Sequence, residues 1–478
     1  MKASSVPTSL SAIRKSLFNG DLTMERLVEQ YLDNIRHTAD HNIFLEVFEE
    51  EARSEAKRIS EKIADNKAGR LAGMVIAIKD NLCYAGHKVS AASKMLEGFE
   101  SLYTATALER LLAEDAIVIG RVNCDEFAMG GSNENSAFGP VKNPLNPQYV
   151  PGGSSGGSGA AVAAHCCLAA LGSDTGGSIR QPASFTGVVG LKPTYGRVSR
   201  HGLIAFASSF DQIGPLTHHV EDAALMLEIM AGFDDMDATS SKREVPSYSE
   251  VAPSQTKRIA YLADCLENEA LDPQVESQMR KVIHTLKNQG HTVEPVSLEG
   301  LNHLVPTYYL LTTAEASSNL ARFDGIHYGY RSPHATDIQS TYKMSRSEGF
   351  GPEVKRRILL GTFVLSAGYY DAYYGKAQKV RRLLKEKTDE IFNQYDLIIS
   401  PTTPTSAFEF GKKDDPVSMY LQDIFTVHAN LVGCPAISIP LFRDERNGLP
   451  IGLQVTAPAY DEKNLIDFAS SLYPGPSV

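Results

Sequence analysis

The sequence predicts an α/β protein built in layers around a largely buried β-sheet. Short apolar runs typical of buried strands alternate along the chain with longer amphipathic runs typical of helices. The chain has 478 residues, of which 42% are hydrophobic and 22% charged. It is therefore long enough to bury a large core, and its composition is that of an ordinary globular protein.

Two helices are expected near the N-terminus. Thr23 is a suitable helix N-cap, and the run that follows it places apolar residues on one side: Leu27, Val28, Tyr31, Leu32 and Ile35. A second run turns Ala52, Ala56, Ile59 and Ile63 inward and ends near residues 66–69.

Farther along, strands are expected at residues 74–78, 117–119, 397–399, 436–439 and 451–455. A helix is expected around residues 107–112, and a second one begins at Asp272-Pro273, a favourable N-cap and first helical position. The chain shows no internal repeat and no long linker, so we predict a single domain over residues 1–478.

Bulk composition excludes several classes of function. A net charge of −11 argues against the chain itself being the main nucleic-acid clamp. No run approaches the roughly 18 apolar residues of a membrane span. The six cysteines are scattered without metal-binding spacing, which predicts reduced cytosolic thiols and no metal site. The first twenty residues faintly resemble a transit peptide, but Leu10, Ile13 and Leu17 also fit an ordinary helix, which favours a cytoplasmic protein.

Two segments rich in glycine and serine, residues 151–164 and 172–184, carry the candidate chemistry. Apolar segments bound both of them, so neither is a flexible linker. Ser178 is a candidate hydroxyl nucleophile for acyl transfer. The consecutive N–H groups of Thr175, Gly176, Gly177 and Ser178 can form an anion-binding concavity, as an oxyanion hole requires.

Lys79 is the candidate base. It lies at the end of a predicted buried strand. An unpaired positive charge is unfavourable there, which favours a functional role for this lysine. Burial lowers the pKa of a lysine from about 10.4 toward neutrality, and serine–lysine variants of the catalytic triad are a known chemical solution. No histidine has an obvious partner. His165 lies in an Ala/Cys-rich run and is expected to be a packed helix residue, and His218 and His219 follow a Gly-Pro pair.

Each of these features also has a structural interpretation. A lysine after a strand is usually a snorkelling surface residue, and a Gly/Ser run is usually a loop. The Walker pattern of phosphate-binding loops is absent. Residues 153–157 match the G-x-S-x-G nucleophile elbow around Ser155, but no histidine context accompanies the match. From composition and spacing alone, a serine hydrolase remains one interpretation among these.

The two segments together resemble the signature of the amidase-signature family, and the match continues through residues 185–200. Here 75 residues separate Lys79 from Ser154 and 24 separate Ser154 from Ser178, which suits the layout of that family. The resemblance implies a large, mostly buried, mixed β-sheet covered by helices on both faces. It further implies a catalytic core at residues 70–215, between a helical part at 1–68 and a substrate-side helical region at 255–395, with C-terminal strands and a helix at 396–478.

The resemblance also implies a role for each matching residue. Ser178 is the nucleophile, Ser154 relays its proton after a cis Gly153–Ser154 bond, and Lys79 is the final base. The N–H groups of residues 175–178 form the oxyanion hole. Ser155 joins the hydrogen-bond network, and Asp174 orients the loop.

Three further stretches, residues 306–329, 353–362 and 419–426, resemble the branch of this family that serves bacterial glutamine-dependent tRNA amidotransferases. This resemblance implies that Arg357 binds the α-carboxylate of glutamine, that Asp423 binds its ammonium, and that Tyr309 hydrogen-bonds near the same end. Arg356 and Tyr308 are identical neighbours of two of these residues, so both assignments stay open. The alternative is that all three are surface ion pairs and packed aromatics.

The resemblance implies L-glutamine as substrate and a heterotrimer with B and C subunits. The B subunit is expected to bind ATP and magnesium and to amidate mischarged tRNA, so this chain needs no cofactor of its own. Whether the product is glutaminyl-tRNA, asparaginyl-tRNA or both stays open. Two other functions remain open: a stand-alone amidase for small aliphatic or aryl amides, and a non-catalytic scaffold. The basic stretch from Lys376 to Lys387 could suggest a tRNA contact, but we interpret it as the solvated face of a helix with Val380, Leu383 and Leu384 inward.

Overall fold

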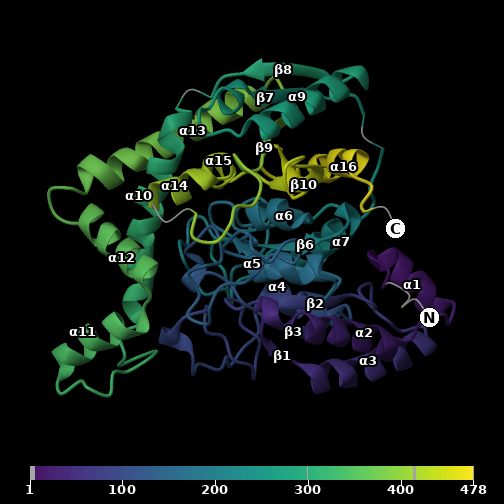
Figure 1. Ribbon diagram of the computed structural model, residues 1–478, viewed down its shortest axis with the longest axis horizontal. Helices are drawn as coiled ribbons and strands as arrows, with labels where there is room; N and C mark the ends of the chain where they lie inside the picture. Colours follow the sequence, from purple (N-terminus) through teal and green to yellow (C-terminus); the bar gives the residue numbers. More distant parts are fainter. Residues whose placement is uncertain (1–5, 254, 299, 413–415, 477–478) are drawn as a thin grey trace.

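A computed structural model describes residues 6–253, 255–298, 300–412 and 416–476. Its centre is an 11-stranded sheet with the order β1-β3-β2-β4-β6-β5-β10-β11-β9-β7-β8 (Figure 1). The strands are β1 (Phe44–Val47), β2 (Val75–Lys79), β3 (Ile117–Val122), β4 (Ala169–Asp174), β5 (Val189–Lys192), β6 (Gln212–Thr217), β7 (Arg258–Leu262), β8 (Thr292–Val296), β9 (Leu397–Pro401), β10 (Ala436–Arg443) and β11 (Pro450–Thr456). The sheet is mixed: β2 is parallel to β3 and β4, and β7 to β8 and β9, whereas the other pairs are antiparallel.

Helices cover both faces of this sheet. They are α1 (Leu10–Phe18), α2 (Met24–His37), α3 (Glu49–Ala64), α4 (Thr106–Ala113), α5 (Gly156–Ala163), α6 (Arg180–Thr186), α7 (Val220–Met230), α8 (Ala263–Leu266), α9 (Pro273–Asn288), α10 (Leu301–Asn319), α11 (Ile338–Gly349), α12 (Pro352–Val364), α13 (Lys376–Phe392), α14 (Pro416–Tyr420), α15 (Val427–Val432) and α16 (Glu462–Leu472). One group, α5 and α6, packs together over the middle strands, and α4, α7 and α16 form a second group. Helix α6 packs on the sheet at two glycines. Gly190 leaves room for Ala183, and Gly452 leaves room for Ser184.

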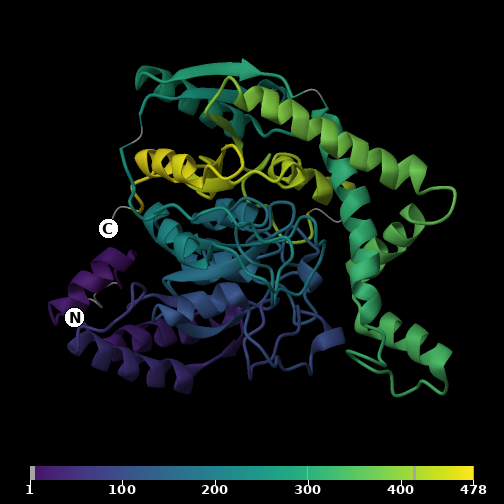
Figure 2. The ribbon, with the colours of Figure 1, turned by 180° about the vertical axis from the view of Figure 1, so that it is seen from behind.

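A helical arm lies along one side of the molecule. Figures 1 and 2 show α10 running beside the sheet, with α11 and α12 on the outer side of the body. Helix α10 packs against both α12 and α13, and α13 packs against α15. This packing brings residues from about 300 to 430 next to the glycine-rich segments, although more than a hundred residues separate the two in sequence.

Several predicted elements are confirmed. The Thr23 side chain accepts a hydrogen bond from the Arg26 N–H and caps α2, and Asp272 caps α9 in the same way. The predicted strands correspond to β2, β3, β9, β10 and β11, although most of them extend beyond the predicted bounds. In the part of the chain that the structure describes, no helix is long and apolar enough to cross a membrane.

Other expectations were wrong. The segment 1–68 is not wholly helical, because β1 pairs with β3 at the sheet edge, and the segment 255–395 contributes β7 and β8. His165 is exposed and lies after α5 with a positive φ of 54°, so it is not a packed helix residue. Leu383 was expected to face inward, yet it is 58% exposed, whereas Leu384 is buried.

Candidate active site

Lys79 ends β2 and is completely buried. Its Nζ donates to the hydroxyl oxygens of Ser154 at 2.7 Å, Ser155 at 3.0 Å and Ser173 at 3.0 Å. Burial lowers the pKa of Lys79 to about 8, although the nearby carboxyl group of Asp125 partly opposes this shift. A significant fraction of Lys79 is therefore neutral near physiological pH, as a base requires.

Ser154 lies between the lysine and the start of α5. The Gly153–Ser154 peptide bond is cis, as the resemblance implies. The Ser154 carbonyl accepts from the Asp125 N–H at 3.1 Å, and the Gly153 N–H donates to Gln181 Oε1 at 2.9 Å. These contacts fix the Gly152–Gly153 and Ser154–Ser155 peptide units, which flank the cis bond, while the Ser154 hydroxyl accepts from Lys79.

Ser178 lies in the turn between β4 and α6. Its carbonyl accepts from the Ser155 N–H at 3.1 Å, so its backbone lies directly beside the Ser154–Ser155 segment. Ser178 is 8% exposed, whereas Ser154 and Lys79 are fully buried. No hydrogen bond between described residues involves the Ser178 hydroxyl. The structure thus joins Lys79 to Ser154 and places Ser178 alongside, at the more accessible end of the three.

The loop before Ser178 presents backbone N–H groups. Among the four predicted oxyanion donors, the Gly177 N–H donates instead to Asp174 Oδ1 at 2.9 Å. Hydrogen bonds within the described ranges leave the N–H groups of Thr175, Gly176 and Ser178 unused. Three of the four predicted donors are therefore available to an oxyanion.

Asp174 holds this loop in place. Besides Gly177, it accepts from the Ile179 N–H, from the buried guanidinium of Arg180 and from Asn430 Nδ2. Burial alone would raise the pKa of Asp174, but Arg180 outweighs that effect and lowers it to about 2. The predicted orienting role of Asp174 thus corresponds to a fully ionised anchor inside the core.

The expected glutamine-binding residues form one cluster, in which α10 and α12 of the helical arm meet the turn after α14. Tyr309 of α10 donates its hydroxyl to Asp423 Oδ2 at 3.1 Å. The guanidinium carbon of Arg357, on α12, lies 5.1 Å from the centre of the Tyr309 ring, a cation–π distance. Burial raises the pKa of Asp423 to about 7, with Arg357 opposing. A cation and a carboxylate thus flank the same tyrosine.

The structure distinguishes the two neighbours that the sequence left open. Arg357 is 4% exposed and faces this cluster, whereas the side chain of Arg356 is 51% exposed, although it also pairs with the buried Glu353. Tyr309 contacts Asp423 and Arg357. Tyr308 has a different position, because a side-chain carbon added at Gly176 would lie 2.5 Å from its hydroxyl. Tyr308 therefore packs against the oxyanion loop.

Sequence reasoning did not identify Ser173, Gln181 or Tyr420. Ser173 is the third hydroxyl on Lys79, and Gln181 holds the Gly153 N–H. The Tyr420 ring stacks on Tyr309 at 4.0 Å and donates its hydroxyl to Glu353, which also pairs with Arg357. Ser173 and Gln181 lie within the signature segment 172–184, and Tyr420 lies within the stretch 419–426, but nothing in the sequence singled them out.

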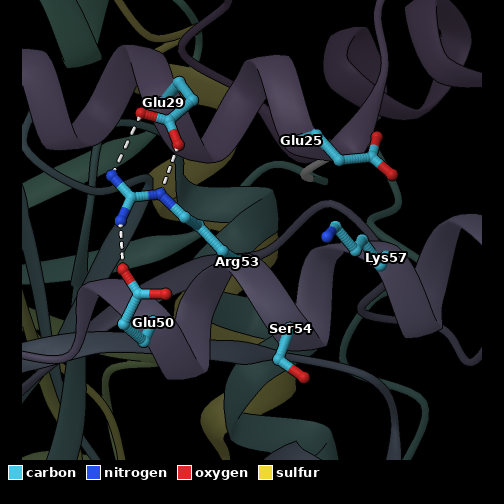
Figure 3. Close-up of a pocket in the computed structure, with 6 residues that line it drawn as sticks. All are labelled: Glu25, Glu29, Glu50, Arg53, Ser54 and Lys57. Carbon is cyan, nitrogen blue, oxygen red and sulfur yellow. Dashed lines mark hydrogen bonds and ion pairs between the residues drawn. The ribbon is translucent and has the colours of Figure 1, made fainter.

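A hollow of about 290 Å³ lies elsewhere, between α2 and α3 (Figure 3). Arg53 crosses it and pairs with Glu29 and Glu50. It contains none of the candidate catalytic residues, and we assign it no chemistry. Across the described ranges, no group of three or more His, Cys, Asp or Glu residues is arranged to hold a metal ion.

The fold and the buried Lys–Ser arrangement define an amidase. The sequence model of the Amidase family matches residues 26–466, and this chain belongs to that family. It is 52% identical to the A subunit of the glutamyl-tRNA(Gln) amidotransferase of Chlorobium luteolum, over 98% of this chain and 99% of that protein. The corresponding protein of Koribacter versatilis is 56% identical over 84% of each chain.

Solved structures agree with this assignment. The crystal structure of the A subunit of glutamyl-tRNA(Gln) amidotransferase from Thermotoga maritima is 40% identical, with a TM-score of 0.78 over 96% of this chain and 93% of that one. The peptide amidase of Stenotrophomonas maltophilia is 29% identical, with a TM-score of 0.80 over 96% and 95% of the two chains. Both a component of an amidotransferase and a peptide amidase thus share this fold.

Proposed function

We propose that this chain is the glutaminase subunit of a glutamyl-tRNA(Gln) amidotransferase, hydrolysing L-glutamine to supply ammonia. The observation that carries the proposal is the cluster of Arg357, Tyr309 and Asp423 beside the serine–lysine network. Free glutamine carries both an α-carboxylate and an α-ammonium, and this cluster offers the Arg357 guanidinium for the first and the ionised Asp423 carboxylate for the second. The names of the relatives at about 50% identity support the same substrate.

The chemistry follows from the geometry of the serines. Ser178 Oγ attacks the side-chain carbonyl carbon of glutamine while its proton passes to Ser154, whose own proton goes to neutral Lys79. The N–H groups of Thr175, Gly176 and Ser178 stabilise the oxyanion. When the carbon–nitrogen bond breaks, the proton returns through Ser154 to the leaving nitrogen as ammonia. Water then hydrolyses the glutamyl ester of Ser178, releasing glutamate.

Ammonia is the product that the partners would consume. We propose B and C partner subunits, with ATP and magnesium on the B subunit, which would activate the glutamyl group of mischarged tRNA for amidation. The support for these partners comes from the relatives' names, which describe one subunit of an amidotransferase. The cytoplasmic setting stays a prediction from the sequence.

The test is ammonia release from L-glutamine by the purified chain, alone and with its B and C partners, ATP and mischarged tRNA. We expect weak activity alone and a strong rise with partners. Ser178→Ala should fold normally and lose roughly a thousandfold or more of the activity, since it lacks the nucleophile. Partner-independent hydrolysis of simple amides, with glutamine ignored, would instead identify a stand-alone amidase.

A further inference from the structure

Gln181 is a buried amide with half of its hydrogen-bonding capacity unused. It lies in the first turn of α6, three residues after Ser178, and is completely buried. Its Oε1 accepts from the Gly153 N–H at 2.9 Å. That bond fixes the orientation of the amide, because a backbone N–H can only donate. Nε2 is left with no partner among the described residues.

An unpaired buried amide nitrogen is costly. Leaving such a donor unsatisfied destabilises a protein, and native structures keep few of them. The side chain is held in place by its oxygen, so it does not turn to find another acceptor. This arrangement is the one expected of a donor reserved for a ligand.

Nε2 faces the candidate glutamine site. A side-chain carbon added at Gly131 would lie 3.5 Å from Gln181 Nε2, 3.5 Å from Met419 Sδ and 3.9 Å from Asp423 Oδ1. Gly131 does not have a positive φ, so its backbone conformation does not require glycine. Its missing side chain instead keeps clear the space that the amide and the carboxylate share.

The substrate offers few acceptors to such a donor, if the proposed function holds. The side-chain oxygen of glutamine is taken by the oxyanion loop, and its ammonium has no lone pair. Its α-carboxylate has about four lone-pair sites, which one arginine does not exhaust. In glutamine this carboxylate is bonded to the carbon that carries the ammonium, so it lies close to Asp423.

We propose that Gln181 is a further substrate-binding residue, whose Nε2–H donates to the α-carboxylate of glutamine alongside Arg357. The proposal rests on the proposed function, since it names a contact within the same site. One amide then serves two purposes: its oxygen accepts from the Gly153 N–H, and its nitrogen binds the α-carboxylate of the substrate. A test has to separate these two purposes.

Gln181→Glu separates them, because it keeps an acceptor for the Gly153 N–H and replaces the donor with a carboxylate oxygen. The full-length chain is assayed at pH 8 for the KM and kcat of L-glutamine. The inhibition constant of 4-aminobutanamide, which is glutamine without its α-carboxylate, is measured in the same assay. We expect the variant to raise the KM for L-glutamine at least 30-fold and to change the inhibition constant of 4-aminobutanamide less than threefold.

Gln422→Glu is the matched control. Gln422 is also buried, adjoins Asp423 and accepts from Thr405, so this change adds a carboxylate nearby without touching the proposed contact. It should alter the KM less than threefold. Should Gln181→Glu fail to fold, Gln181→Met gives the same comparison, because loss of the Gly153 contact affects both compounds equally.

An unchanged KM, or equal weakening of both compounds, would overturn the inference and leave Gln181 as a support for Gly153. In that case the wild-type chain still hydrolyses L-glutamine, so the proposed function stands. A wild-type chain that does not act on L-glutamine at all would overturn both.

Discussion

Lys79 and Asp423 are both poised to titrate near neutral pH. Burial lowers the pKa of the Lys79 ammonium to about 8 and raises that of the Asp423 carboxyl to about 7. The proposed chemistry needs Lys79 neutral, and ammonium binding needs Asp423 ionised. Both requirements are met by loss of a proton, so activity should rise with pH rather than fall.

We therefore expect kcat for L-glutamine to rise through an apparent pKa near 8, and KM to fall as pH rises through about 7. The measurement is glutamate formation from pH 6 to 9.5. The apparent values belong to the coupled network as well as to single residues. Asp423→Asn should remove the pH dependence of KM and leave that of kcat. A kcat that is flat between pH 7 and 9 would contradict a lysine base.

Arg357 and Arg356 provide a matched pair for substrate recognition. Arg357→Ala should raise the KM for L-glutamine strongly, because truncating one partner of a buried charge contact costs about 2–4 kcal/mol, or roughly 30- to 1,000-fold. Arg356→Ala should change KM little, since its side chain points to solvent beside Glu353. A larger effect from Arg356 than from Arg357 would reverse the assignment.

Residues of the reactive centre were predictable from the sequence where they form one contiguous segment, or where a charged residue ends an apolar strand. Lys79 stands at the end of an apolar strand, and residues 175–178 form one short segment. Ser173 was not predictable from periodicity, because every residue of β4 is buried and no alternation shows which side chains face Lys79. The role of Gln181 depends on its tertiary contact with the Gly153 N–H, which the sequence spacing does not predict.

At the scale of secondary structure, the joint between α10 and α12 sets the distance between the binding residues. Tyr309 lies on α10 and Arg357 on α12, and Gly361 lies one turn after Arg357. A side-chain carbon at Gly361 would collide with the Thr313 carbonyl and approach the Ser317 side chain to 2.9 Å. Helices α10 and α12 can therefore pack this closely only because residue 361 is a glycine.

Gly361→Ala should push α12 away from α10 and separate Arg357 from Tyr309. We expect a loss of about 1–3 kcal/mol in the free energy of unfolding, as for overpacking, together with a raised KM for L-glutamine. Thermal melts and steady-state kinetics measure the two effects. Gly98→Ala is the control, because its added carbon meets no atom within 4 Å. Identical behaviour of the two variants would show that the helix joint tolerates the methyl group.

Elements with clear caps or short apolar runs were predictable, whereas the edge strands β1 and β8 were not, and the interior strands β4 to β7 were not predicted either. The caps Thr23 and Asp272 hold as expected. Strand β1 has four half-buried residues with neither alternation nor a continuous buried run, so it lacks both strand signals. Strand β8 contains Pro295, which argues against a strand unless it lies at an edge. The glutamine-binding residues were found only through resemblance, since tertiary packing brings them together.

For the whole molecule, a buried carboxyl group links the N-terminal helix to the body. The Leu10 N–H at the start of α1 donates to both oxygens of Asp222, at 3.2 Å each. Burial raises the pKa of Asp222 from 3.8 to about 7. Between these values the folded protein holds a proton that the unfolded chain has lost, so this group's contribution to stability falls as pH rises from about 4 to 7.

Asp222→Asn removes that titration and keeps an acceptor for Leu10. The melting temperature of the variant relative to wild type should therefore increase from pH 4 to pH 7 and stay constant above. Parallel thermal melts at half-unit steps measure the difference. A difference that does not change with pH would show that Asp222 does not titrate in this range.

The sheet order has a consequence for association. Strand β8 lies at the open end of the sheet, where an unpaired strand can recruit a second chain and start aggregation. Its exposed residues include Glu294 and Pro295: the first places a charge on the edge and the second lacks an N–H to offer an incoming strand. At the opposite edge, β1 is only four residues long, so it offers few backbone groups to an incoming strand. Both ends of the 11-stranded sheet thus carry features that disfavour edge-to-edge pairing.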